Sequence, residues 1–421
     1  MSERDLSALA RELEAIVGAA QVRAPSALEA RAASIIVEPR DANEVAELVR
    51  KCEADAIALA AIGAARTLAQ IRPAPVAVGI SLARINRVIA YEPDDMTVIA
   101  EAGLTIGALN RLTAARGQRL PADPPGPDHT TLGALVAAAQ AGPLRLSEGT
   151  VRDLLIGVRL VGHDARPIHG GGQVVKNVAG YDLMKVMVGS FGTLGIVTET
   201  TFKVRPTPER YTVAIAQFPD LAAALAAAAA LHEAVPLIHL EVVSAAVADA
   251  LGYEALPQVF AGVAGSAEEV AYLLTQAGAM LGSASAIIAD AEAATAYEGL
   301  RDFAADDAAI VAQIAVAPAE LAACLTRSGA EFRAHAGCGV AQIFTRDASN
   351  ADDLGRTLAH WREIARGARG NLRVLRVNDD FHHELNFFDD PPGPALALMR
   401  RLKSTFDPRG VFNPGCFVGG L

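Results

Sequence analysis

The residues best suited to cofactor chemistry lie in a glycine-rich stretch from Gly170 to Glu199. Glycine loses more backbone entropy on folding than any other residue, so a dense run of it indicates left-handed φ angles or a close approach of the backbone to another group. Gly192 and Gly195 frame a tight turn that exposes main-chain N–H and C=O groups. Such groups suit a flat ligand with polar edges, such as a flavin or a nucleotide. An ordinary turn before a strand is the alternative, and glycine alone leaves both open.

The elements around this stretch can be read from its flanks. Residues 196–204 are β-branched and roughly alternating, and Pro206 stops them, which predicts a strand. The chain begins with apolar residues at helical spacing, which predicts a helix over 5–17. A strand at 35–37, a helix capped by Asp41 and a strand over 56–62 follow.

The middle of this region has a similar order of elements. We expect a strand over 96–103 and a helix over 104–115. Four prolines in Leu120–Pro127 exclude a helix or a central strand there and predict a stiff loop. A helix starting at Thr131 and ending near Ala141–Pro143 follows, and residues 147–161 are predicted as a turn and then a strand.

Composition and charge exclude several classes of protein. A chain of 421 residues with 52% hydrophobic and 20% charged residues predicts two globular domains. The balance of 37 basic against 48 acidic residues gives a net charge of −11, which argues against a nucleic-acid partner. No apolar run predicts a membrane span, and the N-terminus does not resemble a secretory signal. The four cysteines lack a C-x-x-C pair, which favours a reduced cytoplasmic setting.

Pro206 and Pro208 predict a boundary between the two domains. Beyond it, alternating strands and helices suggest a second α/β domain, in which residues 338–344 are predicted as an inner strand. His382-His383-Glu384 invites a metal site, because His and Glu are good metal ligands. Adjacent histidines on a strand point to opposite faces, however, so we predict no metal there.

Two segments carry a resemblance to a known family. Lys176–Leu183 and Gly189–Gly195 resemble the signature of FAD-binding oxidoreductases of the vanillyl-alcohol-oxidase type, which have the PCMH fold. Within that family the similarity is to the glycolate oxidase and D-lactate dehydrogenase group. Phe406–Gly415 resembles the family's closing motif, in which the chain returns to the FAD domain and an asparagine, here Asn413, sits near the flavin.

The resemblance implies an α+β fold. We expect an N-terminal helix (1–34), a PCMH-type FAD-binding domain of two α/β subdomains (35–207), a second α/β cap or substrate domain (208–392) and a C-terminal segment that returns to the FAD domain (393–421). It also implies non-covalent FAD, since the first loop has no histidine for a covalent bond. Family members carry several glycines in this loop, whereas here Gly63 is followed by two alanines. The residues expected at the FAD are Gly63, Ala64, Arg66, Thr67, Pro121, Thr131, Gly133, Gly142, Gly149, Asp153, Gly192, Gly195, Ile196, Val197 and Asn413.

The chain resembles the FAD-binding subunits of bacterial glycolate oxidases in three respects: its length, its proline loop and its lack of a His-x-Gly-Asp-Gly-Asn-x-His motif. That resemblance implies a complex with a catalytic flavoprotein subunit and an iron–sulfur subunit. The complex would take electrons from a small 2-hydroxy acid. This chain would be cytoplasmic, and any association with a membrane would be through its partners. Tyr181 and Lys185 are the candidate catalytic side chains. A self-sufficient FAD dehydrogenase and a non-catalytic assembly subunit that has lost FAD remain as alternatives.

Overall fold

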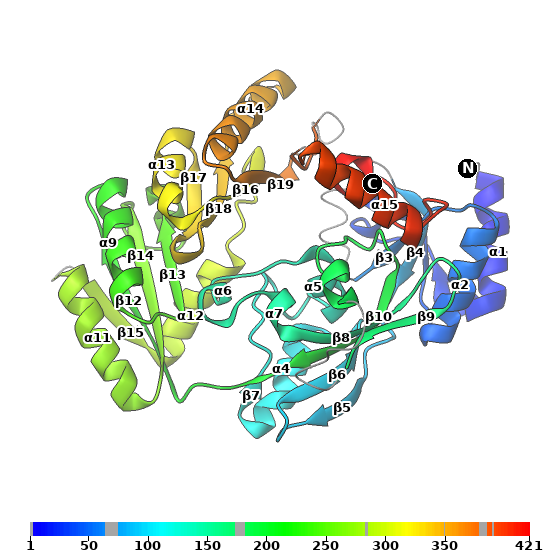
Figure 1. The fold of residues 1–421 in the computed structure, drawn as a ribbon, viewed down its shortest axis with the longest axis horizontal. Coiled ribbons are helices and arrows are strands. Elements are labelled where there is room, and N and C mark those ends of the chain that lie inside the picture. Colours follow the sequence, from blue (N-terminus) through cyan, green and yellow to red (C-terminus); the bar gives the residue numbers. More distant parts are fainter. Residues whose placement is uncertain are drawn as a thin grey trace. The chain divides into compact units, whose positions relative to one another are not determined.

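The computed structural model describes residues 3–63, 75–172, 182–282, 285–348, 350–378, 385–389 and 391–421 (Figure 1). The chain divides into two compact units, each of which is described by itself. The first unit comprises Met1–Gln140, Thr150–Thr207 and Asp390–Leu421, and the second comprises Ala141–Gly149 and Pro208–Asp389.

The first unit begins with a four-stranded sheet in the order β1-β2-β4-β3. Strands β2 (Ala33–Val37), β4 (Val76–Ser81) and β3 (Leu59–Ile62) are parallel, and the short β1 (Val22–Arg23) is antiparallel to β2. Helices α1 (Glu3–Val17) and α2 (Ala42–Ala54) accompany this sheet, and both were predicted from helical spacing. The carboxyl ends of the three parallel strands therefore share one edge of the sheet.

A second sheet in the same unit is antiparallel throughout, in the order β5-β6-β10-β8-β9. Its strands are β5 (Val88–Glu92), β6 (Thr97–Glu101), β10 (Ile196–Lys203), β8 (Leu155–Val161) and β9 (Pro167–Gly171). The short strands β7 (Gln118–Arg119) and β11 (Arg205–Pro206) pair separately. Helices α4 (Ile106–Thr113), α5 (Leu132–Ala138), α8 (Leu183–Met187) and α15 (Gly393–Phe406) complete the unit, and one apolar core joins both of its sheets.

Two sequence predictions for the segment between α5 and β8 were wrong in detail. The turn predicted before β8 contains two short helices, α6 (Arg145–Glu148) and α7 (Val151–Leu154), because Thr150 and Asp153 form a capping box that starts α7. Helix α5 ends at Ala138 rather than near Ala141–Pro143, since Ala139 adopts a left-handed conformation with φ of 51°.

The second unit is built on an eight-stranded sheet in the order β15-β12-β14-β13-β17-β18-β16-β19. Its strands are β12 (Arg210–Gln217), β13 (His239–Val243), β14 (Gln258–Gly265), β15 (Ser285–Ala289), β16 (Ile310–Ala315), β17 (Glu331–His335), β18 (Val340–Thr345) and β19 (Asn371–Val377). The helices are α9 (Leu221–Ala234), α10 (Ala245–Ala250), α11 (Ala267–Leu281), α12 (Asp290–Asp302), α13 (Pro318–Ser328) and α14 (Ala351–Gly367). The predicted alternation of strands and helices is confirmed, although neighbouring strands run antiparallel.

Within the described residues, no helix has both the length and the apolar character needed to cross a membrane. Across the same ranges, no three side chains of His, Cys, Asp or Glu are arranged to hold a metal ion. The metal candidate His382-His383-Glu384 lies outside the described residues. All four cysteines lie inside them, and none forms a disulfide.

Candidate functional site

Three segments that are far apart in the sequence meet in the first unit. A Cβ atom added to Gly63, directly after β3, would lie 2.7 Å from Oγ1 of Thr131, the residue that caps α5. The N–H groups of Gly189 and Phe191 donate to carbonyl oxygens of α5, those of Val136 and Ala137, each at 2.9 Å. The turn over Gly189–Gly195, the glycine turn, is therefore fixed against α5. The N-terminus of α5 in turn contacts the end of β3.

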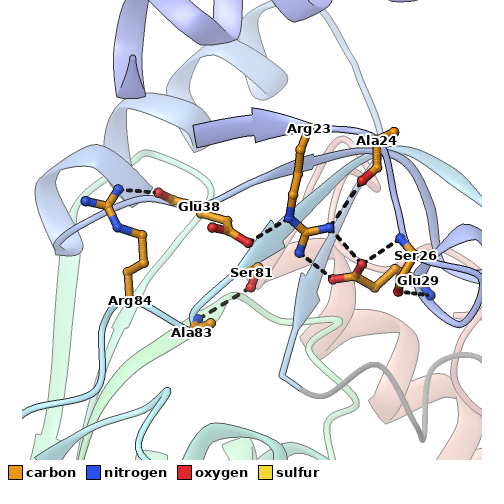
Figure 2. Close-up of polar contacts among 8 residues, drawn as sticks. All are labelled: Arg23, Ala24, Ser26, Glu29, Glu38, Ser81, Ala83 and Arg84. Carbon is orange, nitrogen blue, oxygen red and sulfur yellow. Dashed lines mark hydrogen bonds and ion pairs between the residues drawn. The ribbon is translucent and has the colours of Figure 1, made fainter. Parts of the chain in front are cut away.

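The carboxyl edge of the parallel strands is held by ionic contacts (Figure 2). Arg23 bonds both carboxylate oxygens of Glu29 and reaches Glu38, the residue after β2, at 2.8 Å in each case. Arg84, which follows β4, donates to the backbone oxygen of Glu38 at 2.9 Å. The bond with Arg23 lowers the pKa of Glu29 to about 2. This edge is where ligands bind in parallel sheets, and it is also where Gly63 ends β3.

The turn after α8 has an unusual backbone. Gly189, Phe191 and Gly192 all have positive φ angles, of 77°, 53° and 68°. The turn closes on itself through Thr193, whose N–H and hydroxyl both donate to the carbonyl oxygen of Ser190, at 3.0 and 2.7 Å. Left-handed residues in close succession leave main-chain groups that point to one side, as in the backbone nests that bind anions.

The N–H groups in this turn fit a ligand with hydrogen-bond acceptors. Gly192 and Leu194 are both buried, and among the described residues neither N–H has a backbone acceptor. A buried N–H without a partner costs free energy, so native proteins satisfy nearly all of them. A Cβ added to Gly192 would lie 3.8 Å from the Cβ of Ala61 in β3, so the turn lies against the end of that strand. A cofactor with acceptor oxygens and ring nitrogens, such as FAD, suits this donor set.

Asn413, expected near the flavin, is bonded to the glycine turn. Its side chain is 1% exposed, and its Nδ2 donates to the carbonyl oxygen of Phe191 at 2.5 Å. Its N–H donates to the carbonyl oxygen of Leu59 in β3 at 2.9 Å, and Phe412 forms a parallel bridge with Leu59. The C-terminal segment thus pairs with β3 and is hydrogen-bonded to the glycine turn.

Other predicted cofactor positions serve local structure. Asp153 accepts the Thr150 N–H at 2.8 Å and starts α7, and Gly149 ends α6 with φ of 78°. Gly195 has φ of 147°, and a Cβ there would lie 2.9 Å from the carbonyl oxygen of Val161 in β8. The side chains of Ile196 and Val197 are buried in the core. Of the remaining positions, Pro121 is buried, Gly133 lies in the first turn of α5, and Gly142 belongs to the second unit.

Several predicted site residues lie outside the described part of the chain: Ala64, Arg66, Thr67 and the candidate catalytic Tyr181. The other catalytic candidate, Lys185, is exposed on α8 and forms an ion pair with Asp182 at 2.7 Å. That pair lowers the pKa of Asp182, whose carboxylate also caps α8. The roles of Tyr181 and Lys185 in catalysis stay predictions.

The second unit contains buried titratable groups that the sequence analysis missed. Glu241 and His335 face each other across β13 and β17, with Oε1 and Nδ1 2.6 Å apart, and both are almost fully buried. His239 lies on the same face of β13 as Glu241, and its Nε2 is 2.8 Å from the Tyr211 hydroxyl. In the described residues, Oε2 of Glu241 and Nδ1 of His239 have no hydrogen-bond partner.

Two signals in the sequence could have found this group. His239-x-Glu241 places two titratable residues on one face of a strand, since side chains alternate with a period of two. His335-x-Gly337-x-Gly339 keeps the spacing of the first half of the His-x-Gly-Asp-Gly-Asn-x-His motif. Cys338, Val340 and Gln342 occupy its other positions, so the complete motif is absent.

Comparison with known proteins decides what the first unit binds. A family model described as an FAD binding domain matches residues 33–171, and one described as the C-terminal domain of FAD linked oxidases matches residues 388–416. Residues 33–171 therefore carry an FAD binding domain. The two matches contain the end of β3, helix α5 and Asn413, which meet around the glycine turn.

The relatives are FAD-linked oxidoreductases. The chain is 39% identical over 122 residues to glycolate oxidase subunit GlcE of Escherichia coli (strain K12), a match that covers 29% of this chain and 35% of that protein. It is 26% identical to a D-lactate dehydrogenase of Anaerostipes hadrus over 90% of this chain and 88% of that one. Three relatives, GlcE among them, are matched over only 33% to 40% of their own lengths.

Solved structures support the fold of the FAD-binding domain and of the whole chain. An alkyldihydroxyacetonephosphate synthase superposes with a TM-score of 0.73 over 98% of this chain and 86% of that one, at 18% identity. A p-cresol methylhydroxylase with bound substrate gives 0.70 over 98% and 97%, at 15% identity. At these identities the similarity establishes the fold, and the expected PCMH-type architecture is confirmed.

Proposed function

We propose that this chain is the FAD-binding subunit of a glycolate oxidase-like dehydrogenase complex that oxidises a small 2-hydroxy acid and passes the electrons to an iron–sulfur partner. The observation that supports it is the convergence of Gly63, Thr131 and the glycine turn, three segments far apart in the sequence, around buried N–H donors. The similarity to GlcE supports the choice of complex.

The protein's part in this chemistry is to bind and orient the cofactor. Bound FAD would supply the hydride-accepting ring, and the chain would supply main-chain donors and a fixed geometry. The N–H groups of Gly192 and Leu194 are the donors that the glycine turn would supply.

A second candidate is a stand-alone FAD-dependent 2-hydroxy-acid dehydrogenase. It is favoured by the nearly full-length similarity to a D-lactate dehydrogenase. That similarity does not require a partner chain.

An anaerobic titration of the purified, FAD-loaded chain separates the two. We expect glycolate and D-lactate to leave the oxidised flavin absorbance unchanged when the chain is alone, and to bleach it once the partner subunits are added. Bleaching by either acid in the absence of partners would support the stand-alone enzyme. A flavin that no 2-hydroxy acid bleaches in either setting would contradict both candidates.

A further inference from the structure

Two side chains of the C-terminal segment donate hydrogen bonds to the glycine turn. Asn413 Nδ2 donates to the carbonyl oxygen of Phe191, and Lys403 Nζ, from α15, donates to the carbonyl oxygen of Thr193 at 2.8 Å. Lys403 also donates to the carbonyl oxygen of Phe412 at 2.9 Å and to Asp407 at 2.5 Å. The ammonium group therefore links the turn to the end of the chain through three acceptors.

This ammonium group is buried at a cost that a surface lysine avoids. The Lys403 side chain is 12% exposed and that of Asp407 is 0% exposed. Burial lowers the pKa of Lys403, against the opposing effect of Asp407. Asp407 in turn accepts the N–H groups of Val411 and Phe412 at 2.9 Å each, so both partners are held in place. Buried ions persist only when they are paired and hydrogen-bonded in this way.

The geometry of the peptide unit connects these bonds to the cofactor. In a trans peptide the C=O and the following N–H point in opposite directions, and the described residues contain no cis peptide. Since the carbonyls of Phe191 and Thr193 point toward the C-terminal segment, the N–H groups of Gly192 and Leu194 point away from it. Both N–H groups belong to buried residues, and neither has a backbone acceptor among the described residues.

We propose that Lys403 and Asn413 are positioning residues that aim the Gly192 and Leu194 N–H groups at acceptor atoms of FAD. The proposal rests on the cofactor site proposed above. It assigns the C-terminal segment a role in presetting the turn before the cofactor arrives, so that little ordering free energy is lost on binding. Neither side chain needs to touch the flavin.

The test uses the full chain with three variants and one control. Lys403→Met removes the ammonium group and keeps the aliphatic stem, Asn413→Gly removes the amide and tolerates the φ of 40° at this position, and Lys403→Arg retains donors. Arg400→Met removes a charge from the exposed face of the same helix and is the matched control. Amide hydrogen exchange of the FAD-free proteins is measured first, and FAD affinity by fluorescence titration second.

We expect Lys403→Met and Asn413→Gly to speed exchange at residues 190–197 selectively and to weaken FAD binding by about tenfold each, as for loss of a strong hydrogen bond. Lys403→Arg should recover part of the affinity, and Arg400→Met should match the original chain. Unchanged exchange in the turn, a uniform rise over the whole chain, or faster local exchange with undiminished affinity would each overturn the proposal. Failure of the original chain to bind FAD would refute the proposed function instead. The exchange data would still show whether Lys403 and Asn413 stabilise the glycine turn.

Discussion

At the scale of single residues, His239 is an ionisable group placed where its charge is disfavoured. Its ring is fully buried, and burial lowers its pKa from 6.5 to about 4, against the attraction of Glu241 and with a smaller contribution from His335. The neutral ring faces the Tyr211 hydroxyl, and a Cβ at Gly262 would lie 2.1 Å from its Nε2. The site accepts the neutral form in a closely fitting space.

The first prediction concerns the pH dependence of stability. The folded protein holds His239 neutral down to pH values near 4, whereas the unfolded chain takes up the proton near 6.5. Protonation of His239 therefore favours the unfolded chain. Its effect on the free energy of unfolding is absent above pH 6.5, and it lowers that free energy by roughly 3 kcal/mol in all as the pH falls toward 4. Urea unfolding at pH 7 and pH 4.5 should show a smaller loss in His239→Gln than in the original chain. An equal loss in both proteins would contradict this account, and His129→Gln, at an exposed position, is the control.

The second prediction concerns Gly192. Gly192 and Gly117 both have positive φ angles, of 68° and 63°, so alanine is strained at either by about 1 kcal/mol. Only at Gly192 would the new Cβ meet another group, Nδ2 of Asn413 at 2.7 Å, whereas nothing lies within 4 Å at Gly117. Gly192→Ala should therefore weaken FAD binding while Gly117→Ala leaves it unchanged. Isothermal titration with FAD would show whether the two variants differ as expected or behave alike.

At the scale of elements, helix caps account for several boundaries. Asp41 accepts hydrogen bonds from the N–H groups of Asn43 and Glu44 at 2.9 and 3.0 Å. The carboxylate of Glu44 accepts a hydrogen bond from the Arg40 N–H. These contacts satisfy donors that the first turn of α2 leaves unpaired. Because α2 packs its Val45 and Leu48 into the core next to β2 and β3, its cap supports the sheet edge that carries Gly63.

The third prediction follows from this cap. Asp41→Ala should lower the free energy of unfolding by about 1 kcal/mol, the usual effect of losing an aspartate N-cap. Asp95→Ala, an exposed aspartate in the turn between β5 and β6, should change it much less. Chemical denaturation of both variants provides the measurement, and a similar effect from the two would show that the cap has no special weight.

The same elements show how far the sequence could predict the structure. Asp41 and Thr131 were each expected at helix starts and are N-caps in the structure, because capping depends on residues within one turn. The bond from Asn413 to Phe191 spans 222 positions, and the pair of His335 and Glu241 spans 94. Such contacts arise from tertiary packing, which local patterns do not encode. The resemblance indicated the region of the proposed cofactor site, whereas the bond from Lys403 to Thr193 could be seen only in the structure.

At the scale of the whole molecule, the proposed FAD site lies in the first unit and draws on three separate parts of the chain. The N-terminal strands provide Gly63, the middle segment provides α5 and the glycine turn, and the C-terminal residues hold that turn through Lys403 and Asn413. The matched family models fall on the outer two of these parts and on α5. Cofactor binding should therefore stabilise the unit as a whole, and FAD in excess should raise its thermal unfolding temperature.

The most direct measurement is the flavin content of the full chain. The purified protein is incubated with excess FAD, desalted, and compared by absorbance with its own concentration, while circular dichroism confirms that it is folded. The account predicts a yellow protein with about one FAD per chain, released as free cofactor on denaturation because it is bound non-covalently. A folded, colourless chain after desalting would contradict the central claim.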